Sequence, residues 1–393
     1  MFYLDNSATT PIDPEVLDAM MPYLKEEFGN PSSRHYTLAV NAEKAVAKAR
    51  QQVADLINCR PEEIIFTSCA SESNNMIIKG VSDYLKMYQN KGNHIITSSI
   101  EHKSVLNPCK FLNGEIYTNK DKKRMGKPIP QPKVNRGYNV TFLPVNEKGQ
   151  VSLDDLSNSI NDQTILTSIM WANNEIGNLN KINEIGNILK DKNILFHSDA
   201  TQVLGKINID VSKTPVDFLS FSAHKLYGPK GIGAAFIKKN KTLPEMTALL
   251  HGGSQENGYR AGTHAVHNIV GFGKACEIAK RDLNKNIEHL NMLTTEFKKI
   301  LLDKYPDITF LNDLKEISIP GVVSVFIPDI INEMYISNLS NKLAVSAGSA
   351  CSLGEPSFVI NAIGKSNMTS KFLRFSFNKF NALKDLEKIK ELI

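Results

Sequence analysis

The sequence lacks a long apolar stretch. It contains no run of about 18 consecutive apolar residues, which a membrane-spanning helix needs. Its first residues, MFYLDNS, contain no basic segment followed by an apolar one, so they do not predict a secretion signal. We therefore expect a cytoplasmic protein that does not interact with a membrane.

Cysteine is scarce and shows no paired spacing. The five cysteines, Cys59, Cys69, Cys109, Cys276 and Cys351, are far apart and odd in number. No Cys-x-x-Cys pair and no cluster of cysteine and histidine predicts a zinc or iron–sulfur site. This spacing is typical of reduced thiols in a cytoplasmic protein. We expect no metal site.

Excess charge of one sign is confined to one segment. The formal net charge of the chain is +5, and residues 113–137 alone carry seven basic and two acidic side chains. The remaining chain then carries 39 basic and 39 acidic residues. Three prolines and three glycines in this segment predict a loop outside the sheet. A solvated loop, a docking surface for an acidic partner and a contact to nucleic acid all fit it.

A chain of 393 residues exceeds what one hydrophobic core usually organises. Alternating strand-like and helical patterns predict a large α/β domain at 14–262 with a mostly parallel sheet. Longer helical patterns at 264–281 and 287–302 predict a small α+β domain made of 263–393 together with 1–13. The predicted strands of the large domain are 64–67, 95–98, 140–145, 165–171, 194–198, 218–222 and 232–237.

A lysine follows the strand predicted at 218–222. Lys225 comes directly after Ser222, Ala223 and His224. A lysine at a strand end can bond covalently to an aldehyde cofactor while neighbouring hydroxyls bind the cofactor's phosphate. Taken alone, Lys225 is better explained as a surface lysine in a turn.

Two other strand ends carry groups that suit the same kind of cofactor. Asp199 closes the strand predicted at 194–198, where a carboxylate can pair with a protonated pyridine nitrogen. Ser71 follows the strand at 64–67 and precedes a helical stretch, which predicts an anion site. Ordinary helix caps explain Asp199 and Ser71 one at a time. Three such positions in this order in one α/β domain favour a cofactor site.

The ordered motifs of the chain resemble those of the NifS/IscS-type cysteine desulfurases. These are class V enzymes of fold type I that use pyridoxal 5′-phosphate (PLP). The resemblance extends from residue 3 to about residue 378 and implies a seven-stranded, mostly parallel sheet, a small α+β domain and a homodimer. The matching motifs are residues 3–11 (YLDNSATTP), 29–33 (GNPSS), 68–73 (SCASES), 101–103 (EHK), 173–177 (NNEIG), 199–202 (DATQ), 222–225 (SAHK), 260–263 (RAGT), 349–351 (SAC) and 374–376 (RFS).

The resemblance also implies a role for each matching position. Lys225 is expected to bind PLP covalently, Asp199 to pair with its ring nitrogen, and His102 to stack on the ring and assist proton transfer. The ring oxygen is expected to contact Asn174 and Gln202. The phosphate is expected to bind to Ala70, Ser71, Ser222 and His224, and also to Thr263 of a second subunit. The substrate carboxylate is expected to bind to Arg374 together with Asn30 or Asn174.

The implied reaction converts L-cysteine to L-alanine. Lys225 removes the Cα proton, and Cys351 takes the sulfur as a persulfide. An ordinary thiol with a pKa near 8.5 is only slightly ionised at neutral pH, so His102 or cations of the site are expected to help. Cys351 stands among small residues between Gly348 and Gly354, which favours a mobile nucleophile over a small buried thiol.

The sequence departs from the family pattern at three places. Cys69 and Ser71 stand where Gly and Thr are usual, and we expect Cys69 to be inert. The segment after Cys351 is shorter than in IscS-type members, so we expect this thiol to act close to the PLP. The basic insertion 113–137 replaces a short connection between a helix and a strand.

The sequence leaves the sulfur acceptor open. Relatives supply sulfur to iron–sulfur assembly, tRNA thiolation or DNA phosphorothioation, and the insertion with the short cysteine segment favours DNA phosphorothioation slightly. A selenocysteine lyase, another PLP enzyme of the same fold and a catalytically silent scaffold are the alternative functions. Cys351 argues against a selenocysteine lyase, and the intact set of site residues argues against a catalytically silent scaffold.

Overall fold

Seven apolar segments of the chain form one sheet, in the order β2-β10-β9-β8-β7-β3-β6. All neighbouring strands are parallel except at β10, which is antiparallel to both β2 and β9. The prediction of a mostly parallel seven-stranded sheet is therefore confirmed. The strands are β2 (Ile64–Thr67), β3 (His94–Ser98), β6 (Asn139–Leu143), β7 (Thr164–Ser168), β8 (Leu195–Asp199), β9 (Phe218–Ser222) and β10 (Gly233–Ile237).

This description comes from a computed structural model. It covers residues 1–33, 35–115, 123–124, 127–128, 134–240, 244–312, 318–348 and 356–393. Cys351 and much of the predicted insertion 113–137 lie outside the described residues. Within these ranges, no helix is both long enough and apolar enough to span a membrane.

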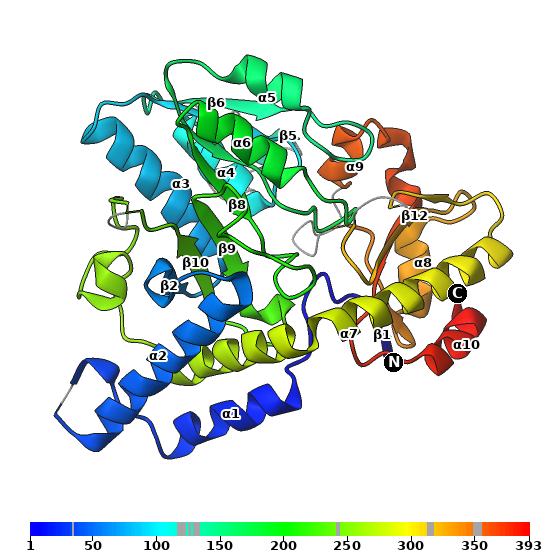
Figure 1. The fold of residues 1–393 in the computed structure, drawn as a ribbon. Helices are drawn as coiled ribbons and strands as arrows, with labels where there is room; N and C mark the ends of the chain where they lie inside the picture. Colours follow the sequence, from blue (N-terminus) through cyan, green and yellow to red (C-terminus); the bar gives the residue numbers. More distant parts are fainter. Residues whose placement is uncertain are drawn as a thin grey trace.

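Both faces of the sheet are covered by helices (Figure 1). Successive side chains of a strand point to opposite faces. On β10, Ala234 and Phe236 join one hydrophobic core, and Ala235 and Ile237 join another. The first core includes α2, α6 and part of α7, and the second includes α3. The helices of this part are α1 (Pro14–Lys25), α2 (Thr37–Ile57), α3 (Ala70–Met87), α4 (Lys103–Leu112), α5 (Leu153–Ser159), α6 (Ile182–Asp191) and α7 (Val266–Lys304).

A second part of the molecule has its own apolar core. Leu4 belongs to this core together with residues from 290 to 393, so the two ends of the chain meet there (Figure 1). A small antiparallel sheet has the order β11-β12-β14, and β1 pairs with β13. The elements are β1 (Phe2–Tyr3), β11 (Thr309–Phe310), β12 (Val322–Phe326), α8 (Asn332–Leu339), β13 (Leu343–Ala344), α9 (Phe358–Ala362), β14 (Phe372–Ser376) and α10 (Leu383–Leu392). The exact domain limits stay a prediction.

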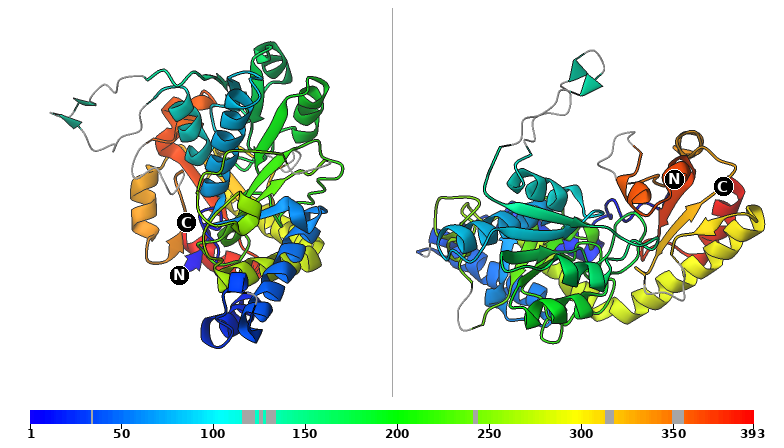
Figure 2. Two further views of the ribbon diagram at one scale, coloured as in Figure 1. Left: turned by 90° about the vertical axis from the view of Figure 1, so that its left-hand side faces the viewer. Right: turned by 90° about the horizontal axis from the view of Figure 1, so that it is seen from above.

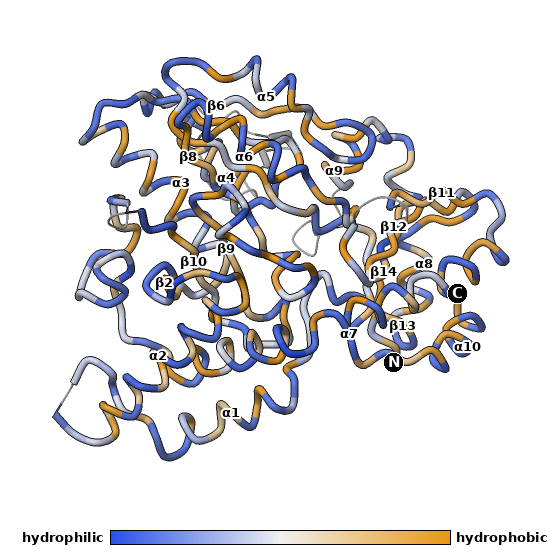
Figure 3. The backbone as a smooth tube through the Cα atoms, in the orientation of Figure 1, coloured by the Kyte–Doolittle hydropathy of each residue, from blue (hydrophilic) through white to orange (hydrophobic). Residues whose placement is uncertain are grey.

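One continuous helix, α7, connects the two parts. Phe272 and Cys276 in its first half belong to the core beside the large sheet, and Leu293 and Phe297 in its second half belong to the other core. Figure 2 shows the helix running along both parts, and Figure 3 shows hydrophobic and hydrophilic residues alternating along it. The prediction of two separate helices here was wrong, because residues 282–286, polar apart from Leu283, contain no proline or glycine that would end a helix.

A small ribbon lies within the predicted insertion. β4 (Lys123–Arg124) and β5 (Lys127–Pro128) pair in antiparallel fashion. Outside it, the backbone N–H of Val134 donates to the carbonyl of Gly114 at 2.8 Å. The two ends of the segment therefore leave the large part of the molecule side by side.

Candidate active site

A cavity of about 310 Å³ opens where several strands of the large sheet end. Five of the parallel strands finish at this edge, so the residues that follow them converge, as is usual in open α/β sheets. The cavity is lined by most of the predicted site residues, namely Ala70, Ser71, His102, Asn174, Asp199, Gln202, Ser222, His224, Lys225 and Arg374.

Lys225 lies in a short 3₁₀ turn, Ala223–Lys225, directly after β9. Its Nζ donates hydrogen bonds to the backbone carbonyls of Ser7 at 2.5 Å and Ala8 at 2.6 Å. These carbonyls belong to a chain segment more than 200 positions away, and they hold the amine at the cavity. Residues 3–11 were recognised as a motif, but nothing in the sequence predicted this contact.

Asp199 ends β8 and is only 6 % exposed. Its Oδ2 accepts a hydrogen bond from Asn74 Nδ2 at 2.8 Å, and its Oδ1 accepts one from the backbone N–H of Thr201 at 3.0 Å. Donors on both oxygens stabilise the ionised carboxylate in a partly desolvated position. Such a carboxylate can pair with a cationic ring nitrogen placed in the cavity.

His102 caps the N-terminus of α4. Its Nδ1 accepts from the backbone N–H of Ser104 at 3.2 Å and lies 2.7 Å from the Ser104 hydroxyl. Burial lowers the pKa of His102, an effect that the nearby Asp199 opposes and Lys225 reinforces. The imidazole is therefore neutral at physiological pH.

The opposite end of the cavity suits an anion. The helix α3 begins at Ala70, and its first backbone N–H groups have no acceptor within the helix. The hydroxyls of Ser71 and Ser222 and the ring of His224 line the same cavity. Burial, followed by the nearby Lys225, lowers the pKa of His224 to about 4, so this ring is neutral and binds as a hydrogen-bonding group.

Cys69 also lines the cavity, as the residue before α3. Its backbone is extended, a conformation open to any residue, so a side chain is tolerated at this position. The neighbouring Gly233 is different, because a Cβ there would lie 2.4 Å from the Phe221 carbonyl and 2.8 Å from the Cα of Cys69. Glycine at 233 thus permits the close approach of β10 to this end of the site.

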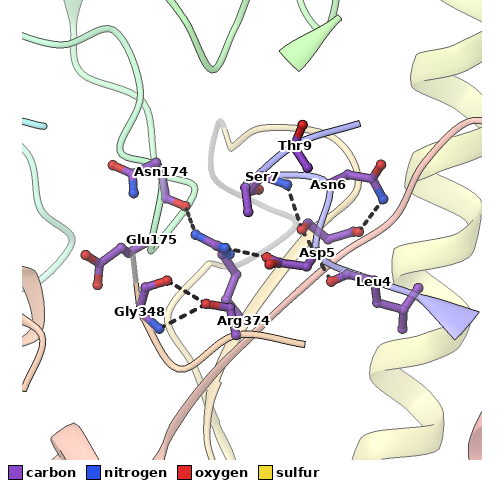
Figure 4. Close-up of polar contacts among 12 residues, drawn as sticks. Leu4, Asp5, Asn6, Ser7, Thr9, Asn174, Glu175, Gly348 and Arg374 are labelled. Carbon is purple, nitrogen blue, oxygen red and sulfur yellow. Dashed lines mark hydrogen bonds and ion pairs between the residues drawn. The ribbon is translucent and has the colours of Figure 1, made fainter. Parts of the chain in front are cut away.

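Arg374 supplies a cation at the other side of the cavity (Figure 4). It lies on β14 and is 1 % exposed. Its Nη1 donates to the backbone carbonyl of Asn174 at 2.7 Å, and its Nη2 pairs with Asp5 Oδ1 at 2.6 Å. Its Nε is buried and has no hydrogen-bond partner within the described part of the chain. A guanidinium fixed in this way can bind a small carboxylate.

Two of the predicted residues that the structure describes are not brought to this cavity. Asn30 and Thr263 are exposed and do not line it, and Asn30 Oδ1 instead accepts from the backbone N–H of Ser32. Thr263 was expected to act from a second subunit, so its role stays a prediction. Cys351 lies outside the described residues, and its role stays a prediction as well.

The residues flanking the segment of Cys351 do lie beside the cavity. Before it, Ser346 and Arg374 exchange two backbone hydrogen bonds, at 2.7 and 3.2 Å. After it, the hydroxyl of Ser357 donates to Glu175 Oε2 at 2.5 Å. Both connections lead to the Arg374 side of the site.

Several residues of the site were not predicted from the sequence. They are Asp5, Ser7, Ala8, Asn74 and Ser104, whose contacts hold Arg374, Lys225, Asp199 and His102 in place. The only available signal was that three of them fall within the motif at 3–11 and that Asn74 directly follows the motif at 68–73.

Comparisons with known proteins identify the family of this chain. Residues 2–389 match the family model described as Aminotransferase class-V. Cysteine desulfurase IscS of Rickettsia typhi (strain ATCC VR-144 / Wilmington) is 41% identical over 394 residues, covering 100% of this chain and 90% of the relative.

Two solved structures are similar over nearly the whole chain. A NifS-like protein has a TM-score of 0.85 and 35% identity, covering 100% of this chain and 98% of its own. The structure described as SspA in complex with cysteine has a TM-score of 0.79 and 33% identity, covering 97% of this chain and 100% of its own. The chain therefore belongs to the class V aminotransferase family, among the NifS/IscS-type cysteine desulfurases.

Proposed function

We propose that the protein converts L-cysteine to L-alanine and transfers the sulfur through a persulfide on Cys351 to an acceptor protein. The observation that carries this proposal is the single cavity shared by the Lys225 amine, the Asp199 carboxylate and the Arg374 guanidinium. A nucleophilic amine, a partner for a cationic ring and a carboxylate receptor are the three groups that an amino-acid substrate and PLP together require.

The residues of the cavity fit PLP. Its phosphate suits the N-terminus of α3 with Ser71 and Ser222, and its ring nitrogen suits Asp199, whose two oxygens are already held by donors. The cavity volume of about 310 Å³ is within the usual range for a small-molecule site. When bound at Lys225, the cofactor supplies a sink for the electron pair that remains after the Cα proton is removed.

The side chains of the chain itself perform the remaining tasks. Arg374 binds the carboxylate of cysteine and thereby orients its Cα–H bond. The Nζ of Lys225 takes the Cα proton, and the carbonyls of Ser7 and Ala8 can hold this amine at the cavity when it is not bonded to the cofactor. The Asp199 carboxylate would pair with the ring nitrogen and favour its cationic form.

Chain length supports Cys351 as the sulfur acceptor. Position 351 is three residues from Gly348, and three residues of chain reach at most about 11 Å. Gly348 lies near Glu175, because a Cβ added to it would be 3.6 Å from Glu175 Oε2. A tether of this length allows the thiol to reach the Arg374 side of the cavity, where the substrate sulfur is expected.

Purified protein reconstituted with PLP tests the function directly. We expect an absorbance band near 390–420 nm, an estimate from the chemistry of a lysine-bound cofactor, and equal amounts of alanine and sulfide from cysteine under reductant. Lys225→Ala should lack both the band and activity. Cys351→Ala should keep the band but release no sulfide from cysteine, whereas Cys59→Ser, remote from the cavity, should behave as wild type.

The alternatives give different results in the same assay. A selenocysteine lyase would keep its activity on selenocysteine in Cys351→Ala, and a silent scaffold would stay colourless with PLP. Either outcome would contradict the proposed function.

We also propose that the acceptor docks at the base of the insertion 113–137. Here Lys79, Lys86 and Arg136 gather around the rings of Phe111 and Tyr138, with the Arg136 guanidinium 3.8 Å and the Lys79 amine 4.8 Å from the centroid of Phe111. Burial, followed by the charge of Arg136, lowers the pKa of Lys79. Cations crowded in this way favour a partner with acidic side chains.

The adjacent ends of the insertion allow a clean test. Because Val134 N–H bonds to the Gly114 carbonyl, replacing residues 116–132 with Gly-Gly should leave the large sheet intact. We expect this variant to form alanine at the wild-type rate and to fail to bind the acceptor in a pull-down. Loss of both would mean that the segment is needed for folding.

The pathway and cellular context are also proposals. The insertion and the short cysteine segment favour DNA phosphorothioation, in a cytoplasmic homodimer. Tracing labelled sulfur from cysteine in cells separates the candidates, since the label reaches DNA, tRNA or an iron–sulfur scaffold protein according to the pathway. Label in tRNA or in iron–sulfur proteins alone would contradict phosphorothioation.

A further inference from the structure

A buried amide connects two functional residues of the cavity. Asn74 lies on α3 and is fully buried. Its Nδ2 donates to Asp199 Oδ2 and to Ser104 Oγ, both at 2.8 Å. An ionised carboxylate can only accept, so the amide must present its nitrogen to Asp199. Both N–H bonds of Asn74 are therefore committed.

The direction of the next hydrogen bond follows from this arrangement. The hydroxyl oxygen of Ser104 accepts from Asn74, which leaves its own O–H to donate. The Ser104 oxygen is 2.7 Å from His102 Nδ1, so the hydroxyl donates to that nitrogen. The backbone N–H of Ser104 donates to the same Nδ1 at 3.2 Å, and a backbone N–H cannot reverse its role.

Two donors on Nδ1 determine the state of the imidazole. A neutral imidazole carries one proton, and Nδ1 must keep its lone pair to accept. The proton is therefore on Nε2. A second proton on Nδ1 would face the Ser104 N–H, so the imidazolium form is disfavoured.

We propose that Asn74 and Ser104 are positioning residues that hold His102 as the neutral tautomer protonated at Nε2. The series of hydrogen bonds Asp199–Asn74–Ser104–His102 thus links the orientation of the Asp199 carboxylate to that of the His102 imidazole. His102 enters the reaction as a donor through Nε2–H and does not take up a proton at that atom. This catalytic consequence rests on the proposed function, whereas the tautomer itself does not.

Nitrogen-15 NMR of the full-length protein labelled at histidine tests the tautomer without any assay of activity. The His102 signals are identified by their loss in His102→Gln. We expect the shifts and two-bond couplings of an imidazole protonated at Nε2, unchanged between pH 8 and pH 6. A ring protonated at Nδ1, or an imidazolium signal at pH 7, would overturn the proposal.

Substitutions test the two positioning residues separately. Ser104→Ala should move the His102 signals toward a mixture of tautomers and lower kcat about tenfold at unchanged KM, and Ser104→Thr should restore both because it keeps the hydroxyl. Asn74→Ala should shift the same signals. Spectra of Ser104→Ala and Asn74→Ala identical to wild type would remove these residues from the proposal. If the protein instead shows the expected tautomer but no desulfurase activity, the proposed function fails and the tautomer stands.

Discussion

At the scale of single residues, Arg374 depends on partners from distant parts of the chain. Its guanidinium is almost fully buried and has one anionic neighbour, Asp5, at 2.6 Å. Removal of one partner leaves a buried charge uncompensated, which is costly. Asp5→Asn keeps an oxygen that can accept from Nη2 but loses the negative charge, whereas Asp5→Ala loses both.

We expect Asp5→Ala to raise the KM for cysteine about tenfold, a change of ~1.4 kcal/mol, with kcat nearly unchanged. Asp5→Asn should have a smaller effect in the same direction, because Arg374 keeps its position better. Steady-state kinetics of alanine formation measure both. Asp18→Ala, at an exposed position on α1, is the control. A KM of Asp5→Ala equal to that of the control would show that Asp5 does not orient Arg374.

Glu101 makes stability depend on pH. Its side chain is fully buried, and its Oε1 accepts from the Ser98 hydroxyl at 2.6 Å and from the Met170 N–H at 2.8 Å. Burial is the main cause that raises the pKa of Glu101 from 4.5 to about 8. Between these two values the folded protein keeps a proton that the unfolded chain has lost. Stability from this group is therefore complete below pH 4.5 and declines as the pH rises toward 8.

Glu101→Gln removes this titration and keeps the oxygen that accepts both hydrogen bonds. We expect the free energy of unfolding to fall less between pH 5.5 and pH 8 in the variant than in wild type, where this group alone contributes up to about 1.4 kcal/mol per pH unit. Urea unfolding at the two pH values measures the difference. Equal pH slopes would show that Glu101 is ionised in the folded protein.

At the scale of elements, the strands composed mainly of apolar residues were predicted best from the sequence. Strands β2 and β9 coincide with the predicted runs 64–67 and 218–222, because both are rich in apolar residues and polar residues end them. The helix α2 was not predicted, since alanine occupies much of its buried face and the apolar stripe is weak. The break expected in α7 was wrong for a related reason: the mostly polar residues 282–286 lie where the helix passes from one core to the other.

The same stretch of α7 gives a test of how the two cores depend on each other. Lys285 is exposed there, so its side chain contributes little packing. Lys285→Pro removes a helical hydrogen bond and should cost about 3 kcal/mol or more, whereas Lys285→Ala should be neutral or slightly stabilising. We expect Lys285→Pro to unfold in two steps by calorimetry, because the helix no longer connects the cores. A single transition would mean that other contacts couple them.

At the scale of the whole molecule, local patterns predicted the centre of the site but not its supports. Lys225, Asp199 and Ser71 each follow a strand, and parallel strands bring such positions together whatever the details of the fold. Contacts such as Asp5 with Arg374 join residues 369 positions apart. No periodicity or spacing carries that information, because it depends on how the first residues pack against β14.

Charge is the other property of the whole molecule that can be tested. The net charge of +5 equals the excess carried by residues 113–137. An acidic acceptor should therefore be attracted toward this segment, and the attraction should weaken as the screening length falls from about 10 Å at 0.1 M salt to about 3 Å at 1 M. We expect the association rate of wild type to fall at least tenfold over this range.

Two variants separate a local from a global effect of charge. Replacing 116–132 with Gly-Gly removes five basic residues and one acidic residue, and should leave a slow association that hardly responds to salt. Changing the exposed Lys384, Lys388 and Lys390 of α10 to alanine lowers the net charge by a similar amount elsewhere and should keep the wild-type salt dependence. Stopped-flow measurements with the acceptor compare the three proteins. If the α10 variant loses its salt dependence too, total charge rather than the insertion attracts the partner.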